Sequence, residues 1–241
     1  MEKVNRRIAA IVVAAGAGRR MGDTGEDLPK QFVEVEGRPL FVNSLLPFEA
    51  HPLVQDITVV LPPGRLKGWE DRLRHDFGLE KILAVVAGGA HRRQSVRLGL
   101  EAASAGQPWP EDALVAVHDG VRPLLSIALL SRVIEAALDS GAAVPALPVA
   151  DTVVEVDEEN GWGGVVDRSR LRLVQTPQVF RAGWLEEAHR STGGEEATDD
   201  AQLVRALGHP ISLVAGEVVN IKVTDLLDME LVHYLVAGGN L

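Results

Sequence analysis

Several residue types are missing or scarce in this chain of 241 residues. There is no cysteine, which excludes disulfides, a thiolate nucleophile and zinc held by sulfur. A chain without cysteine fits a reducing compartment, so we expect a cytoplasmic protein. Positive charge is also short, because the formal net charge is −10. Chain-wide attraction to nucleic acid or to an anionic membrane needs a basic face, and we therefore expect neither partner.

Long hydrophobic runs are absent as well. No segment approaches the roughly 18 apolar residues of a membrane span. Residues 1–20 begin like a secretory signal, with basic residues before a short apolar run. Glycines interrupt that run and Arg19-Arg20 close it. These breaks favour a buried first strand over a signal peptide.

What the chain does have is the composition of a globular protein, with 46% hydrophobic and 24% charged residues. We expect one domain over residues 1–241. Continuous apolar runs, typical of strands covered on both faces, occur at 8–15, 56–62, 82–89, 112–119, 141–149 and 210–216. Helical patterns occupy 39–50, 64–77, 91–105, 126–140, 181–192, 199–208 and 225–237. This alternation predicts an α/β fold with a mostly parallel sheet and helices on both faces.

Two helices carry more specific expectations. Pro47 should kink or end the helix at 39–50, since proline clashes with the preceding turn. The last helix should open at Thr224 or Asp225 and turn its leucines toward the core. These leucines are Leu226, Leu227, Leu231 and Leu235.

The alternation of apolar runs with helical patterns is interrupted at about 149–175. Residues 151–175 alternate polar with β-branched side chains around Asn160-Gly161, which predicts a protruding β-hairpin arm. An isolated two-stranded arm is marginal in water, so we expect it to rest on a second copy of the chain in a homodimer. The alternative is an arm that folds back onto its own domain.

The turn after the first strand, Gly16 to Gly22, is the first place to look for a ligand in such a sheet. Gly16 and Gly18 can bring backbone N–H groups against phosphate oxygens, while the small Ala14 and Ala15 leave room for a nucleobase. A dinucleotide fingerprint would need glycine where Met21 stands, and no Gly-Lys pair exists for a Walker A loop. A glycine turn alone is weak evidence, since a plain tight turn has the same pattern.

Cations follow this turn. Lys30 and Arg20 can converge on whatever the turn holds, which suits a triphosphate with charge developing at the attacked phosphorus. Arg19 is better explained as a surface charge on a loop. Lysine is rare, with five against 19 arginines, so each lysine is a candidate for a place that needs a compact point charge.

Further on, Asp119 ends a strand where a carboxylate could hold Mg²⁺; the alternative is an Asp that caps the turn.

At this point the residues resemble the 2-C-methyl-D-erythritol 4-phosphate cytidylyltransferase family. The matching blocks run in order along almost the whole chain: AAGAGRRMG, LPKQF, GGAHRRQSV, VHDGVRP, PVADTV, VVDRSRL, QTPQVF, ATDDA and NIKVT. The resemblance implies a Rossmann-like domain with a β-arm, a homodimer, Mg²⁺ as cofactor, and transfer of CMP from CTP to methylerythritol phosphate with release of pyrophosphate.

The resemblance also implies roles for individual residues. Arg20, Lys30, Arg168 and Lys222 would be catalytic. The nucleotide would lie against Ala14, Ala15, Gly16, Gly18, Gly89, Ser95 and Asp119, with Asp119 also holding the metal. Methylerythritol phosphate would lie against Asp151, Thr152, Arg168, Thr176 and Thr198, with Arg168 reaching across the dimer and Arg122 neutralising a phosphate.

One departure concerns the base. The family often has an acidic residue after Gly88-Gly89, whereas Ala90-His91 carry none here, so the cytosine amino group would rely on backbone carbonyls. Three other functions stay open. They are a ribitol 5-phosphate or sugar-phosphate nucleotidyltransferase of the same fold, an NAD-dependent oxidoreductase, which the failed glycine fingerprint disfavours, and a non-catalytic nucleotide-binding regulator.

Overall fold

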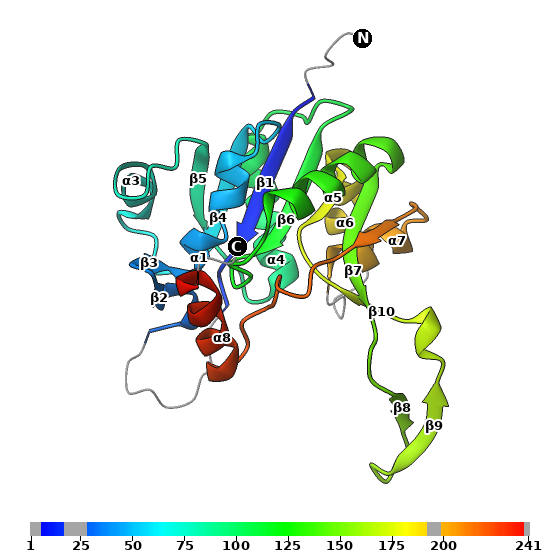
Figure 1. Cartoon of the computed structure of the whole chain (residues 1–241). Coiled ribbons are helices and arrows are strands. Elements are labelled where there is room, and N and C mark those ends of the chain that lie inside the picture. The colour runs from blue at the N-terminus through cyan, green and yellow to red at the C-terminus, as the bar shows by residue number, and fades with distance from the viewer. Residues whose placement is uncertain (1–5, 17–27, 192–198, 239–241) are drawn as a thin grey trace.

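The structure is a computed structural model, and it describes residues 6–16, 28–191 and 199–238. Its centre is an eight-stranded sheet in which the strands run in the order β10-β7-β11-β6-β1-β4-β5, with β12 paired to β7 (Figure 1). The strands are β1 (Ile8–Val13), β4 (Asp56–Leu61), β5 (Ile82–Ala87), β6 (Leu114–Asp119), β7 (Ala142–Pro148), β10 (Arg172–Val174), β11 (Gln178–Arg181) and β12 (Ser212–Ala215). All six predicted strands are therefore present.

The pairing explains where a site can form. β1 pairs in parallel with β4 and β6, and β4 pairs in parallel with β5. β10 and β11 are antiparallel to β7, which makes the sheet mixed but mostly parallel, as predicted. The parallel strands end at one common edge, the carboxyl edge, where Val13 and Asp119 lie side by side in register.

Helices cover both faces of the sheet. They are α1 (Leu40–Asn43), α2 (Leu46–Ala50), α3 (Trp69–His75), α4 (Arg92–Ser104), α5 (Ile127–Ser140), α6 (Ala182–Arg190), α7 (Asp200–Ala206) and α8 (Leu226–Ala237). Alternate residues of β1 point to opposite faces, so Ala10 and Val12 join the core under α2 and α5, whereas Ile11 joins the core under α4 and α6. This is why the strands read as continuous apolar runs.

The helix expected at 39–50 is broken into α1 and α2, with Leu45 as the cap before α2 and Pro47 in its first turn. Proline is tolerated there because the first N–H groups of a helix have no partner within the helix. The expected strain at Pro47 is thus relieved by starting a new helix.

The prediction for the last helix was wrong in its facing. α8 begins after Asp225, as predicted, with a capping box between Asp225 and Asp228, and its buried residues are Met229 and Val232. Leu226, Leu227 and Leu231 are exposed, and of the four predicted leucines Leu235 alone packs against the buried cluster. The helix is apolar on most sides, so its sequence pattern could not choose the buried face.

The arm is present as β8 (Val153–Val156) and β9 (Trp162–Val166), joined by a turn in which Asn160 has a φ of 61°. The pair projects from the body of the molecule in Figure 1. Residues 172–174 were expected in the arm but belong to the main sheet as β10, because Arg172 to Val174 pair with β7. β11 and the short pair β2 (Glu34–Val35) and β3 (Arg38–Pro39) were not expected. Within the described residues, no helix is long and apolar enough to span a bilayer.

One glycine shows how closely a helix approaches the sheet. A Cβ atom added to Gly99 of α4 would lie 2.6 Å from Ile11 Cγ2 and 3.0 Å from Val60 Cγ2. Both neighbours are fully buried, so neither can move away without disturbing the core.

We predict that Gly99→Ala lowers the free energy of unfolding by about 1–3 kcal/mol, because overpacking outweighs the gain in helix propensity. Gly183 of α6 is the matched control, since an added Cβ there meets nothing within 4 Å. Gly183→Ala should be neutral or stabilising by up to about 1 kcal/mol. Urea unfolding measures both variants, and equal effects would contradict the close approach of α4.

Candidate active site at the carboxyl edge

The carboxylate of Asp119, at the end of β6, is the centre of a charged cluster at this edge. Lys222 Nζ lies 2.9 Å from its Oδ2 atom, Arg92 Nε lies 3.2 Å from its Oδ1 atom, and Arg122 Nε lies 3.9 Å from Oδ2. The side chain of Asp119 is only 9% exposed, whereas that of Lys222 is 44% exposed. A nearly buried anion is therefore held by three cations, of which Lys222 is the most open to solvent.

The electrostatics keep this carboxylate charged. Burial by itself would raise the pKa of Asp119, but the positive charges of Arg92, Lys222 and Arg122 more than offset burial and hold that pKa well below its ordinary value. The exposed ammonium of Lys222 can turn away from Asp119 at small cost. It is therefore free to pair with a more highly charged anion at this edge.

A chain of hydrogen bonds fixes the backbone behind Asp119. Arg122 O can only accept, so His118 Nε2 donates to it across 3.1 Å. His118 Nδ1 then accepts from the hydroxyl of Thr176, 3.0 Å away, and that hydroxyl accepts in turn from Asp119 N at 3.1 Å. Thr176 is buried with its hydroxyl engaged in this chain.

A second element brings Lys30 to the same edge. Lys30 lies in a 3-10 turn (Lys30–Phe32), and its Nζ atom donates to Val223 O, one residue from Lys222, at 2.5 Å. Gln31, its buried neighbour, donates from Nε2 to Ala14 O at 2.8 Å and to Gly16 O at 2.7 Å. The turn after β1 and the segment that bears Lys30 are therefore tied together.

Gly89 and Ser95, which the resemblance places against the nucleotide, lie at the turn between β5 and α4. Ser95 Oγ accepts from Gly89 N and donates to His91 O, both at 3.1 Å. His91 caps α4 by accepting from Gln94 N at 3.2 Å, and Gln94 Oε1 accepts from Ala90 N at 2.8 Å. Ala90 and His91, which stand where the resemblance leads us to expect an acidic residue, thus hold the turn in shape.

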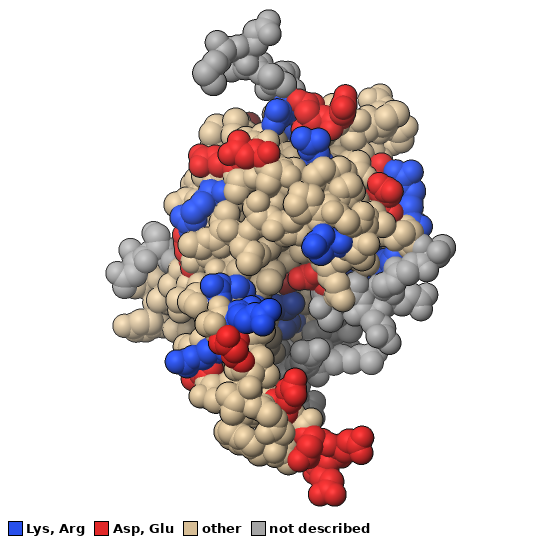
Figure 2. Space-filling model, turned by 90° about the vertical axis from the view of Figure 1, so that its right-hand side faces the viewer, with Lys and Arg blue, Asp and Glu red and all other residues tan. Residues whose placement is uncertain are grey.

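The arm residues are not part of this cluster within one chain. Asp151, Thr152 and Arg168 are exposed, and the guanidinium of Arg168 donates to the carbonyl oxygen of Ala150 at the base of the arm. Figure 2 shows acidic side chains at the far end of the arm and basic ones nearer the body. Gly18, Arg20 and Thr198 lie outside the described residues.

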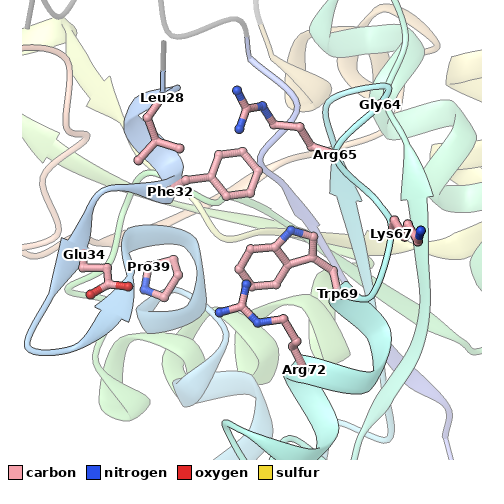
Figure 3. A pocket seen from close by; sticks show the side chains of 9 residues that line it. All are labelled: Leu28, Phe32, Glu34, Pro39, Gly64, Arg65, Lys67, Trp69 and Arg72. Atoms are coloured by element: carbon pink, nitrogen blue, oxygen red, sulfur yellow. The ribbon is translucent and has the colours of Figure 1, made fainter. Parts of the chain in front are cut away.

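A pocket of about 420 Å³ opens beside the segment that bears Lys30 (Figure 3). Its floor is aromatic, with Phe32 and Trp69 5.7 Å apart between ring centroids, and Arg72 lies over the Trp69 ring. The lining residues are Leu28, Phe32, Glu34, Pro39, Gly64, Arg65, Lys67, Trp69 and Arg72. None of them was predicted as a site residue.

Sequence reasoning missed Arg92, Gln31, His118 and Asp200. All four stand inside blocks that carry the family resemblance, but each looked like an ordinary polar residue beside a more obvious neighbour. Among the described residues, no group of three or more His, Cys, Asp or Glu side chains could hold a metal ion by itself.

A mostly parallel sheet covered by helices on both faces, with cations gathered at its carboxyl edge, defines an α/β protein with a place for an anionic ligand at that edge. A family model described as IspD, 2-C-methyl-D-erythritol 4-phosphate cytidylyltransferase, matches residues 8–237. The chain belongs to this family.

Individual relatives agree with the family model. A 2-C-methyl-D-erythritol 4-phosphate cytidylyltransferase of Syntrophus aciditrophicus is 40% identical over 220 residues, covering 90% of this chain and 91% of that protein. The corresponding protein of Geotalea uraniireducens is 39% identical and covers 97% of this chain and 98% of its own length. The crystal structure of the Thermus thermophilus enzyme of this name is 40% identical, with a TM-score of 0.74 over 94% of this chain and 98% of that one.

The hydrogen-bond chain behind Asp119 predicts a pH dependence of stability. Burial lowers the pKa of His118 to about 4 from its ordinary value of 6.5. Between pH 6.5 and 4 the imidazole of His118 therefore binds a proton in the unfolded chain but not in the folded chain. The free energy of unfolding thus decreases as the pH falls.

We expect this residue to account for a loss on the order of 2 kcal/mol across that interval. His118→Gln removes the titrating group, so the free energy of unfolding of the variant should fall less steeply with pH, whatever its absolute stability. Urea unfolding at several pH values measures the slopes. Identical slopes for wild type and variant would show that His118 is not held neutral in the folded protein.

Proposed function

We propose that this protein transfers CMP from CTP to 2-C-methyl-D-erythritol 4-phosphate and releases pyrophosphate, a step of the non-mevalonate route to isoprenoid precursors. The observation that carries the proposal is membership of the cytidylyltransferase family over residues 8–237. The cluster of Lys222, Arg122 and Asp119 at the carboxyl edge supplies the charges that the reaction needs.

The reaction is an in-line displacement in which a phosphate oxygen of methylerythritol phosphate attacks the α-phosphorus of CTP and pyrophosphate leaves. The nucleophile is already an anion at neutral pH, so positioning and charge neutralisation lower the barrier and no general base is needed. Lys30 donates to the carbonyl oxygen of Val223, the residue after Lys222, so both lysines belong to the same edge and are suited to neutralise the phosphates at the attacked centre. Arg20 would act with them by the family pattern.

Magnesium is the cofactor we propose. Asp119 fits it, because a single ionised carboxylate beside substrate phosphates is the usual protein contribution to a Mg²⁺ site. When bound, the ion would neutralise charge on the triphosphate and its leaving group. Arg122 would remain at the edge of this site, held by Asn220 O at 2.8 Å.

The reaction is tested by measuring pyrophosphate release with Mg²⁺ while four nucleoside triphosphates are crossed with methylerythritol, ribitol and hexose phosphates. We expect release with CTP and methylerythritol 4-phosphate to exceed every other pair by at least about 100-fold in kcat/KM, since a site that hydrogen-bonds its substrate strongly rejects analogues that leave those groups unpaired. Preference for ribitol 5-phosphate or a hexose phosphate would reassign the acceptor. A protein that binds CTP without releasing pyrophosphate would be a regulator.

We also propose a homodimer in which the arm reaches the partner. The strand pair β8–β9 carries exposed apolar side chains on Val156, Trp162 and Val165, with fractional exposures of 62%, 71% and 66%. An arm with so much apolar surface and no core of its own is stabilised by packing against a second subunit. In that arrangement Asp151, Thr152 and Arg168 would complete the acceptor site of the partner. A cytoplasmic location remains a prediction from composition.

The dimer predicts a specific effect of charge on the arm. Trp162→Glu should shift sedimentation from dimer to monomer at micromolar concentration and raise the KM for methylerythritol phosphate, because a buried unpaired charge opposes association. Tyr234→Glu is the matched control, since Tyr234 on α8 is an equally exposed aromatic at 72%. A wild-type protein that sediments as a monomer, or two variants with equal effects, would contradict this use of the arm.

A further inference from the structure

Arg92, at the start of α4, connects two buried carboxylates. Its Nε atom lies 3.2 Å from Asp119 Oδ1, and its Nη1 atom lies 2.7 Å from Asp200 Oδ2. Asp200 is the first residue of α7, and its other oxygen lies 3.0 Å from His189 Nε2 on α6. A continuous path of hydrogen bonds therefore leads from His189 through Asp200 and Arg92 to Asp119.

The two bonds of Arg92 are unequal. The contact with Asp200 is the shorter one, and the side chain of Asp200 is 1% exposed against 9% for Asp119. Burial would lower the pKa of Arg92, but Asp200 first and Asp119 second raise it above its ordinary value. Asp200 is thus the anchor of the guanidinium and accepts from Nη1, Asp119 accepts from Nε, and the buried Nη2 atom has no hydrogen-bond partner among the described residues.

The anchor is itself held firmly. The start of α7 is tied to β11, because Gln178 Oε1 accepts from Ala201 N at 3.0 Å and Gln178 Nε2 lies 3.3 Å from Asp199 Oδ2. Asp199 caps the helix by accepting from Gln202 N at 2.8 Å. These contacts leave little freedom to the carboxylate of Asp200, so Arg92 approaches Asp119 from a fixed direction.

The consequence for Asp119 is a division between its two oxygens. Oδ1 is occupied by the anchored Arg92, whereas Oδ2 faces Lys222, whose side chain is exposed and can leave. Arg122 also approaches Oδ2, but only to 3.9 Å, so Lys222 is its one close partner and Oδ2 becomes accessible to an incoming group when Lys222 turns away. Without the anchor, Arg92 could move onto both oxygens in the two-bond arrangement that arginine prefers with carboxylates.

We propose that Asp200 is a positioning residue of this enzyme: through Arg92 it fixes the orientation of the Asp119 carboxylate and keeps Oδ2 available at the reacting centre. The inference rests on the proposed function for the step that it serves. A structural alternative is that the Arg92–Asp200 pair only ties α4 to α7. The two differ in what the folded variant can do.

Two variants separate these roles. Asp200→Asn removes the anchor charge, and Arg92→Lys keeps a positive charge but cannot reach two carboxylates at once with a planar fork. For both we expect kcat to fall on the order of 100-fold, as a misplacement of about 1 Å can cause. The KM for CTP should change by less than about 3-fold, because neither residue is placed against the nucleotide.

The matched control is another Arg–Asp pair that lies away from the carboxyl edge. Arg7 Nε lies 2.8 Å from Asp56 Oδ2 at the amino end of β4. Asp56→Asn should lower the melting temperature without lowering kcat by more than about 2-fold, since this partly buried pair lies at the opposite edge of the sheet from Asp119. If Asp200→Asn or, should that variant not fold, Arg92→Lys behaves like Asp56→Asn, the pair is structural and the inference is wrong.

A second measurement does not depend on activity. In urea unfolding, the effects of Asp119→Asn and Asp200→Asn should be non-additive although the two side chains share no direct bond, because both act on Arg92. In the Arg92→Met background the same pair should become additive. Additivity in both backgrounds would overturn the relay. A wild-type protein that releases no pyrophosphate would instead refute the proposed function, and the unfolding cycle would still show whether Asp200 and Asp119 are coupled through Arg92.

Discussion

The charge of one buried carboxylate organises the site. Asp119 can remain ionised at 9% exposure only because cations surround it, and those cations come from three separate parts of the chain. Removing Asp119 would leave Arg92, Arg122 and Lys222 to repel one another. The same arrangement holds more positive than negative charge around the carboxylates of Asp119 and Asp200, which is what a site for polyanions requires in a protein of net charge −10.

The sheet explains how distant residues meet. Val13 and Asp119 are adjacent in register although they lie far apart in the sequence, because β1 and β6 run side by side in parallel. The turn after β1 and the end of β6 therefore face the same solvent. The final segment then crosses this edge, with Val223 N donating to Val121 O at 2.9 Å, and this crossing delivers Lys222 to Asp119.

Much of the fold could be predicted from sequence, because continuous apolar runs indicate strands buried on both faces, and each of the six runs contains one strand of the main sheet. β11 was not predicted since four residues leading directly into a helix leave no separate signal. The start of α8 at Asp225 was one of the two predicted starts, whereas its facing was predicted wrongly because an apolar pattern on most sides of a helix does not choose a face. The buried face depends on what α8 packs against, which the sequence of the helix does not contain.

The site shows the same division. Residues that end strands or stand as rare lysines were predicted, and Asp119 and Lys222 do form an ion pair. Arg92, Asp200 and His189 could not be predicted together, because their connection depends on how α4, α6 and α7 pack on one face of the sheet. Sequence alone does not contain that packing angle. The arm residues could be assigned only by resemblance, and within one chain they lie apart from the cluster.

The 3-10 turn that carries Lys30 and Gln31 has a mechanical consequence. Its lysine binds the last segment at Val223, and its glutamine binds two carbonyls of the first turn at Ala14 and Gly16. Two consecutive side chains therefore bridge the segment that follows the first strand and the segment that precedes the last helix, although these segments lie near opposite ends of the sequence. A substitution in this one short turn would loosen both attachments together.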